Sequence, residues 1–85
     1  MSNYTVYLLK SKTTGKHYTG QTEDLERRLK EHNAGLLGKS TKGKGPWDVI
    51  YKEEYKTRSE AMEREKYLKT GAGRDYLKKI VENYS

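Results

Sequence analysis

The sequence has no cysteine, which excludes a disulfide framework and a thiolate nucleophile, and its two histidines alone cannot form a structural zinc site. It also has no apolar run that approaches the roughly 20 residues of a membrane-spanning helix. The first ten residues, MSNYTVYLLK, lack the charged start and the small-residue cleavage site of a signal peptide. We therefore expect a soluble, cytoplasmic protein that neither enters a membrane nor is exported by that route.

Hydrophobic residues are scarce and charged residues are abundant. Only 32% of the 85 residues are hydrophobic, so we expect one small domain, residues 1–85, with a thin core. Eighteen Lys and Arg against twelve Asp and Glu give a formal net charge of +6 and a pI near 9.5. This surplus suits a polyanion such as nucleic acid, but it is equally compatible with a basic surface that has no specific partner.

The order of apolar and turn-forming segments predicts an α+β fold, in which a small antiparallel three-stranded sheet is packed with helices. Glycine-rich residues 35–47 are expected to form a connection without a long helix, and GAG at 71–73 is expected to end the second helix. Strands are predicted at residues 4–10, 16–20 and 47–52, and helices at residues 24–32, 57–71 and 74–84.

The turn SKTTG between the first two strands sets their register. If the turn centres on residues 13 and 14, Leu9 lies opposite Tyr18. Tyr7 then lies opposite Gly20, so the two tyrosines share one face of the sheet as diagonal neighbours. Tyrosines in strands most often serve packing, so this pattern alone does not assign them a catalytic role.

Helical periodicity separates the two adjacent arginines in LERRLKEHNAG, residues 25–35. At about 100° per residue, Arg28 and His32 lie on the border of the buried stripe, whereas Arg27 faces water. A guanidinium held by packing in this position can bind a phosphate. The alternative is an arginine whose head reaches water beside a half-buried helix histidine.

The same periodicity places Glu65 in the middle of the apolar stripe of the second helix, with Glu63 pointing away. A carboxylate on a core-facing stripe is costly unless it meets a cation, hydrogen-bond donors or a metal. Two interpretations remain open. Glu65 forms a salt bridge to Arg28 or Arg64, or it is a metal ligand at the floor of a cleft.

Five segments in this order resemble the GIY-YIG nuclease superfamily. They are TVYLL, then YTG eleven residues after the first tyrosine, then QTEDLERRLKEHNAG, KGKGPW and SEAMEREKYLK. The small standalone members are most similar, and the N-terminal incision domain of the bacterial excision-repair nuclease UvrC is more distantly similar. The resemblance runs from Tyr4 to about Leu77. TVY replaces GIY and YTG replaces YIG, so both tyrosines are kept, and Gly20 keeps room for close backbone approach.

The resemblance implies a set of site residues, and it matches Arg28 and Glu65, which periodicity had already favoured over their neighbours. Glu65 falls on the position of the metal-binding glutamate. An asparagine that some members place after this glutamate is left unassigned. The catalytic residues implied by the resemblance are Tyr7, Tyr18, Arg28, His32 and Glu65.

The activity implied by the resemblance is hydrolysis of phosphodiester bonds in DNA by an endonuclease, as in DNA repair. Tyr18, supported by Tyr7 or His32, would remove a proton from the attacking water, and Arg28 would bind the phosphate. Glu65 would hold one Mg²⁺ or Mn²⁺ ion, since magnesium keeps several waters. Because a phenol with a pKa near 10 is a poor base at neutral pH, nearby cations must lower that pKa.

The remaining expectations concern substrate contacts and alternatives. Lys16 is a candidate cation beside Tyr18, and Lys39, Lys42 and Lys44 are expected to contact the nucleic-acid backbone without reading bases. The expected partner is duplex or branched DNA, cut in a structure-directed or weakly specific way by a monomer, with RNA as an open alternative. The competing hypothesis is a non-catalytic, basic nucleic-acid-binding module of the same fold.

Overall fold

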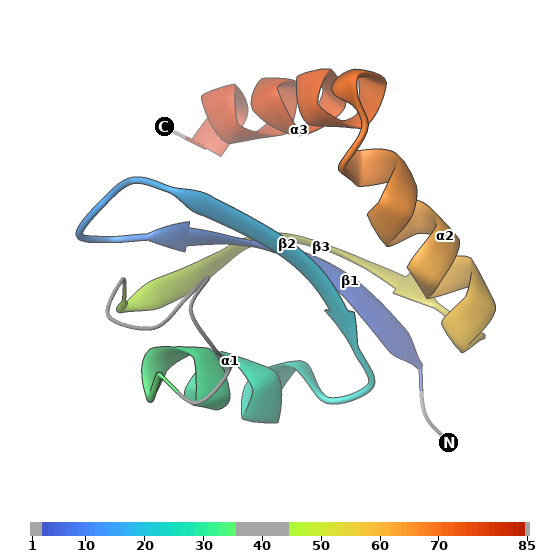
Figure 1. Cartoon of the computed structure of the whole chain (residues 1–85), viewed down its shortest axis with the longest axis horizontal. Helices are drawn as coiled ribbons and strands as arrows, with labels where there is room; N and C mark the ends of the chain where they lie inside the picture. Colours follow the sequence, from blue (N-terminus) through green and yellow to red (C-terminus); the bar gives the residue numbers. More distant parts are fainter. Residues whose placement is uncertain (1–2, 36–44, 85) are drawn as a thin grey trace.

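Three antiparallel strands form the centre of the fold, and helices cover both faces of the sheet (Figure 1). This computed structural model describes residues 3–35 and 45–84, and the predicted α+β architecture is confirmed. Lys39, Lys42 and Lys44 lie outside the described residues. The elements are β1 (Tyr4–Ser11), β2 (His17–Thr22), α1 (Leu25–Asn33), β3 (Trp47–Tyr55), α2 (Arg58–Leu68) and α3 (Gly71–Tyr84).

The strand order is β2-β1-β3, so β1 is the central strand and β2 is an edge strand. In the hairpin, Leu9 pairs with Tyr18 and Tyr7 pairs with Gly20, which confirms the predicted register. Side chains directly opposite each other in antiparallel strands lie on the same face. Tyr7 and Tyr18 therefore lie on one face, and Figure 1 shows α1 on one side of the sheet and both α2 and α3 on the other.

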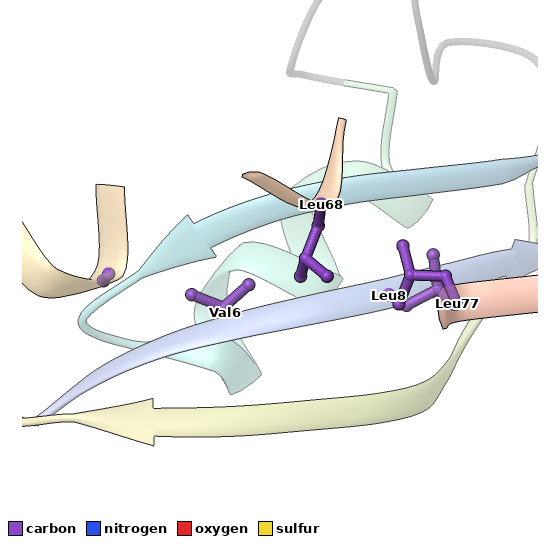
Figure 2. Close-up of a cluster of buried hydrophobic side chains, with 5 residues drawn as sticks. Val6, Leu8, Leu68 and Leu77 are labelled. Carbon is purple, nitrogen blue, oxygen red and sulfur yellow. The ribbon is translucent and has the colours of Figure 1, made fainter. Parts of the chain in front are cut away.

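One apolar cluster fills the space between the sheet, α2 and α3. Val6 and Leu8 point to this side of β1 and meet Ala61 and Leu68 from α2 and Leu77 from α3. Figure 2 shows Leu8 of the strand close to Leu77 of the helix, with Val6 and Leu68 beside them. Each fully buried leucine contributes about 1.5–3 kcal/mol relative to an exposed one. This cluster fixes α2, which carries Glu65, against the sheet.

A second cluster lies on the opposite face, beneath α1. Tyr7 and Leu9 from β1 pack with Trp47 at the start of β3, and Leu25 and Leu29 of α1 cover them. Alternate residues of a strand point to opposite faces, so the run VYLL supplies both clusters. The nearly continuous apolar sequence of β1 follows from its burial on both sides.

Polar side chains define both ends of α1. Asp24 is the N-cap and accepts a hydrogen bond from the Arg27 N–H at 3.1 Å. After the helix Gly35 takes a positive φ of 74°, which a glycine adopts without strain. Asn33 Oδ1 accepts a hydrogen bond from the Trp47 N–H at 2.6 Å, which ties the end of α1 to the start of β3. The helix is displaced by one residue from its predicted bounds.

The capping box predicted at the start of α2 is present, with Thr57 as the N-cap and Glu60 three residues later. The end of α2 differs from the prediction because the helix stops at Leu68. Thr70 Oγ1 then accepts a hydrogen bond from the Gly73 N–H at 3.2 Å, and the segment GAG forms the first turn of α3. No helix in residues 3–35 or 45–84 is long and apolar enough to cross a membrane.

β3 extends three residues beyond its predicted end, to Tyr55. Glu53 explains this extension because its carboxylate is fully engaged. It accepts hydrogen bonds from the hydroxyls of Tyr51 and Tyr55, and two more from Arg64 at 2.8 and 3.1 Å. Hydrogen bonds from β3 itself and from α2 thus stabilise this strand segment, although its sequence, KEEY, is polar.

Candidate active site

Tyr7, Tyr18 and His32 converge on the face of the sheet that α1 covers. The Tyr7 hydroxyl and His32 Nε2 lie at hydrogen-bond distance, 3.0 Å. The ring centroids of Tyr18 and His32 are 4.8 Å apart, and those of Tyr7 and Tyr18 are 6.3 Å apart. Side chains from β1, β2 and α1 therefore form one aromatic cluster, named here the Tyr-Tyr-His cluster.

Gly20 on β2 provides the space in which this cluster forms. A Cβ atom at Gly20 would lie 2.6 Å from the Tyr7 hydroxyl oxygen and 3.0 Å from Cε1 of Tyr18. Both distances are too short for nonbonded atoms. The third residue of YTG is therefore glycine because the Tyr7 hydroxyl lies directly over its backbone, as expected from the need for close approach.

The two tyrosines differ in burial. Tyr7 is 2% exposed, whereas Tyr18 is half-buried. Burial, reinforced by Tyr18 and opposed by Arg28, raises the pKa of Tyr7 above its usual range. Burial, followed by the charge of Arg28, lowers the pKa of His32. At neutral pH the bond between Tyr7 and His32 therefore joins two uncharged groups, and Tyr18 is the phenol that solvent can reach.

Arg28 lies beside the cluster, and Arg27 points to solvent, as helical periodicity predicted. The Nε atom of Arg28 is buried and has no hydrogen-bond partner among the described residues. Glu31 Oε1 is 3.9 Å from this nitrogen, which is an ion-pair distance but too long for a hydrogen bond. A buried donor without a partner is costly, so Arg28 is suited to receive an anionic ligand.

Glu65 forms neither of the two salt bridges considered from the sequence. Its Oε2 atom is 2.6 Å from Lys69 Nζ, one turn further along α2. Arg64 is instead occupied by its two hydrogen bonds to Glu53. The ion pair with Lys69 forms instead because side chains four residues apart on a helix are neighbours, so no second element has to be positioned. This spacing, Glu followed by Lys at i+4, is visible in the sequence, and Lys69 is the neighbour that the sequence analysis missed.

The Glu65 carboxylate acts on the cluster through its charge. It is one of the groups that raise the pKa of Tyr7, and its side chain is 24% exposed. Among the described contacts, none joins it directly to either phenol, to His32 or to Arg28. The described hydrogen bonds of Lys16 involve only its backbone, within the hairpin turn, and none of them joins it to the cluster.

The described residues contain no group of three His, Cys, Asp or Glu side chains that could hold a metal ion. Glu65, the carboxylate that the resemblance assigns to a divalent ion, belongs to α2 and so comes from the helix on the opposite side of the sheet from α1. A single half-buried carboxylate fits Mg²⁺, which keeps several of its waters when bound. The Lys69 side chain, which now pairs with the carboxylate, is 51% exposed and can turn to solvent when an ion binds.

The chain is similar to a known protein family, to individual proteins and to a solved structure. A family model described as the GIY-YIG catalytic domain matches residues 3–78. A UPF0213 protein of Staphylococcus saprophyticus is 39% identical over 82 residues, which cover 96% of this chain and 99% of that protein. One from Staphylococcus haemolyticus is 40% identical with the same coverage. The solution NMR structure of a UPF0213 protein from Bacillus halodurans is 34% identical, with a TM-score of 0.54, and covers 92% of this chain and 84% of that one.

Proposed function

Because the chain belongs to the GIY-YIG family, a family of nucleases, we propose that it is an endonuclease that hydrolyses phosphodiester bonds in DNA with one divalent metal ion. Its choice of substrate is structure-directed or weakly specific. The observation that carries the proposal is that Arg28, beside the Tyr-Tyr-His cluster, has a buried Nε with no hydrogen-bond partner among the described residues. A cation with an unused donor next to solvent-accessible Tyr18 is an arrangement for holding a phosphate during attack by water.

Tyr18 is the proposed general base. It is the phenol that solvent reaches, and it packs against His32, whose ring centroid is 4.8 Å away. Tyr7, whose pKa is raised by burial, keeps its proton and serves to hold His32 through their 3.0 Å hydrogen bond. His32 thus has a fixed ring orientation. In its deprotonated form Tyr18 would take the proton from the water, and Tyr7 positions the ring against which Tyr18 packs.

Arg28 is the proposed phosphate ligand. Its guanidinium stabilises charge that develops on the phosphate oxygens, because a prearranged cation needs little reorganisation during the reaction. Glu65 is the proposed ligand of Mg²⁺ or Mn²⁺, and the bound ion would neutralise phosphate charge and lower the pKa of a nearby water. Glu65 has to exchange Lys69 for the ion, so metal affinity without nucleic acid should be weak.

Nicking of supercoiled plasmid tests the proposal. The wild-type protein should nick in the presence of Mg²⁺ or Mn²⁺ and not in EDTA. Glu65→Gln and Arg28→Ala should lose about 100-fold or more in rate, as expected for groups that act on the transition state. The matched controls are Glu63→Gln and Arg27→Ala, because these exposed neighbours point away from the site.

Two results would decide against an enzyme. They are absence of nicking with either metal, and equal effects of the Glu63 and Glu65 substitutions on nicking. Salt-sensitive plasmid binding that Glu65→Gln does not change, without any nicking, would favour the non-catalytic nucleic-acid-binding module. Circular dichroism of each variant separates loss of activity from loss of fold.

A further inference from the structure

A cavity of about 500 Å³ lies on the face of the sheet opposite the Tyr-Tyr-His cluster, between β2, α2 and α3. Its floor is apolar, formed by Leu8, Leu68, Leu77 and Val81. Figure 2 shows the three leucines, which come from β1, α2 and α3. The volume lies within the range of small-molecule sites, about 300–1,000 Å³. We name this space the α3 cavity.

Positive charge surrounds the α3 cavity. Lys69, Arg74 and Lys78 line it, and none of the described residues that line it is an aspartate or a glutamate. Arg74 and Lys78 have no ion-pair partner within residues 3–35 and 45–84, and both are exposed. An apolar floor with a cationic rim is complementary to a flat apolar group that carries an anionic substituent. A nucleotide has this chemistry, with a base that stacks and a phosphate that pairs with cations.

The α3 cavity adjoins the candidate active site across the edge strand β2. Lys69 lines the cavity and also pairs with Glu65 at 2.6 Å, so one side chain connects the two sites. On β2, Tyr18 and Thr19 both line the cavity, and the ring of Tyr18 also packs with His32 of α1. Because no strand among residues 3–35 and 45–84 lies on the outer side of β2, a nucleic-acid strand can pass over this edge.

We propose that the α3 cavity binds one unpaired nucleotide of the substrate, with its base on the apolar floor and its phosphate at Arg74 and Lys78. The inference rests on the proposed function for the identity of the substrate. His17, at the cavity wall, has a pKa lowered by burial and then by Lys10, so its neutral ring can pack against a base. A base within a duplex is stacked and paired and does not enter, so flapped, gapped or single-stranded DNA should be preferred over continuous duplex.

Fluorescence anisotropy in EDTA, where no cleavage occurs, tests this preference. The probes are a labelled DNA duplex with a short unpaired thymidine flap and a blunt duplex of the same length. The wild type should bind the flapped probe about tenfold or more tightly, because base stacking contributes this much in single-strand sites. In Arg74→Gln/Lys78→Gln this ratio should fall towards one. The matched control Lys66→Gln/Lys79→Gln removes two exposed charges from α2 and α3 outside the cavity and should keep the ratio.

A second variant tests whether filling the cavity, without any change of charge, removes the preference for the flap. Thr19→Trp fills the cavity without changing the net charge, and aromatic residues are well tolerated in strands. It should also remove the preference for the flap. Titration of ¹⁵N-labelled wild type with thymidine monophosphate should shift the amide signals of Thr19 and Leu77. Circular dichroism confirms that each variant is folded.

The inference is overturned if the wild type binds both probes equally, if the cavity and control variants lose the same affinity, or if the nucleotide shifts no signal at the cavity. Its failure is distinguishable from failure of the nuclease proposal, since binding is measured without metal. Flap preference without plasmid nicking would reject only the enzyme. Metal-dependent nicking with equal binding of the two probes would reject only the nucleotide site.

Discussion

Tyr7 and Tyr18 carry the same hydroxyl group in different surroundings. The hydroxyl of Tyr7, on the central strand β1, lies over Gly20 and beside His32. Tyr18 is half-buried on the edge strand. Burial keeps the proton on Tyr7, and its hydroxyl is committed to His32. Replacement by phenylalanine should therefore mainly lower the rate at Tyr18 and mainly lower the stability at Tyr7.

Tyr18→Phe should lower the rate of plasmid nicking by about 100- to 10,000-fold, the usual contribution of general base catalysis. It should leave the free energy of unfolding nearly unchanged. Tyr7→Phe should cost about 1–3 kcal/mol of stability, because the buried His32 Nε2 loses its partner, and should reduce the rate less. Single-turnover kinetics and urea denaturation measure both effects. A larger rate loss in Tyr7→Phe would show that the assignment of the base is wrong.

His32 should make stability depend on pH near neutrality. Its pKa is lowered in the folded state, mainly by burial, from an ordinary value of 6.5. As the pH falls through 6.5 the unfolded chain takes up a proton that the folded protein resists, so the unfolded state binds more protons. The stabilisation is therefore complete above 6.5 and is lost as the pH falls through the lowered pKa.

Urea denaturation between pH 7.5 and 5.5 measures this dependence. Wild type should lose stability as the pH falls, and His32→Gln should show a smaller loss. His17 also has a lowered pKa, so the variant His17→Gln isolates the contribution of His32. Identical slopes in wild type and His32→Gln would contradict the account.

Local sequence patterns were sufficient to predict every element in the described part of the chain. The hairpin register followed from counting outwards from the turn, and helical periodicity separated Arg28 from Arg27. These predictions succeed because strand alternation and helical rotation act over a few residues. The convergence of Tyr7, Tyr18 and His32 was accessible only through the family resemblance, since spacing alone does not show which helix covers which face.

Predictions failed where the deciding contact came from elsewhere in the fold. The sequence KEEY remains in β3 because Arg64, eleven residues beyond Glu53, binds that carboxylate. GAG begins α3, rather than ending α2, because Thr70 caps the new helix at a tight corner. One of the two interpretations left open for Glu65 was a salt bridge to Arg28 or Arg64, but Arg64 is already engaged by Glu53.

The corner between α2 and α3 should depend on Gly73 and not on Gly71. A Cβ atom at Gly73 would lie 2.1 Å from the carbonyl oxygen of Tyr67 and 2.4 Å from Cα of Leu68. These are backbone atoms, which cannot move aside as a flexible side chain would. Gly73→Ala should therefore destabilise the protein by about 3 kcal/mol or more.

Gly71→Ala is the matched control, because a Cβ at Gly71 meets nothing within 4 Å. It should stabilise the protein by about 0.5–1 kcal/mol, since alanine loses less backbone entropy in a helix. Urea denaturation of both variants gives the comparison. Equal effects of the two substitutions would show that the corner is not tightly packed.

The whole molecule combines a basic surface with a site that lies beside an open sheet edge. The net charge of +6 attracts a polyanion from any direction, whereas Arg28, the proposed phosphate ligand, would hold an anion at one place. Long-range attraction and local binding are therefore separable. Salt should weaken the long-range attraction strongly, because each phosphate contact releases counterions. It should change the rate of the chemical step much less.

The long-range attraction of the nucleic acid can be tested at Lys39, Lys42 and Lys44. If each contacts one phosphate, replacing all three by glutamine should reduce the slope of log affinity against log salt by about 2 to 3, since each contact contributes about 0.9 on duplex DNA. The loss should be the same for different base sequences, because phosphate contacts carry no sequence information. The control replaces the exposed Lys56, Lys66 and Lys79, which lie outside the candidate site and the α3 cavity. An equal change of slope in both triple variants would mean that only the total charge matters, and that the segment between α1 and β3 makes no contact of its own.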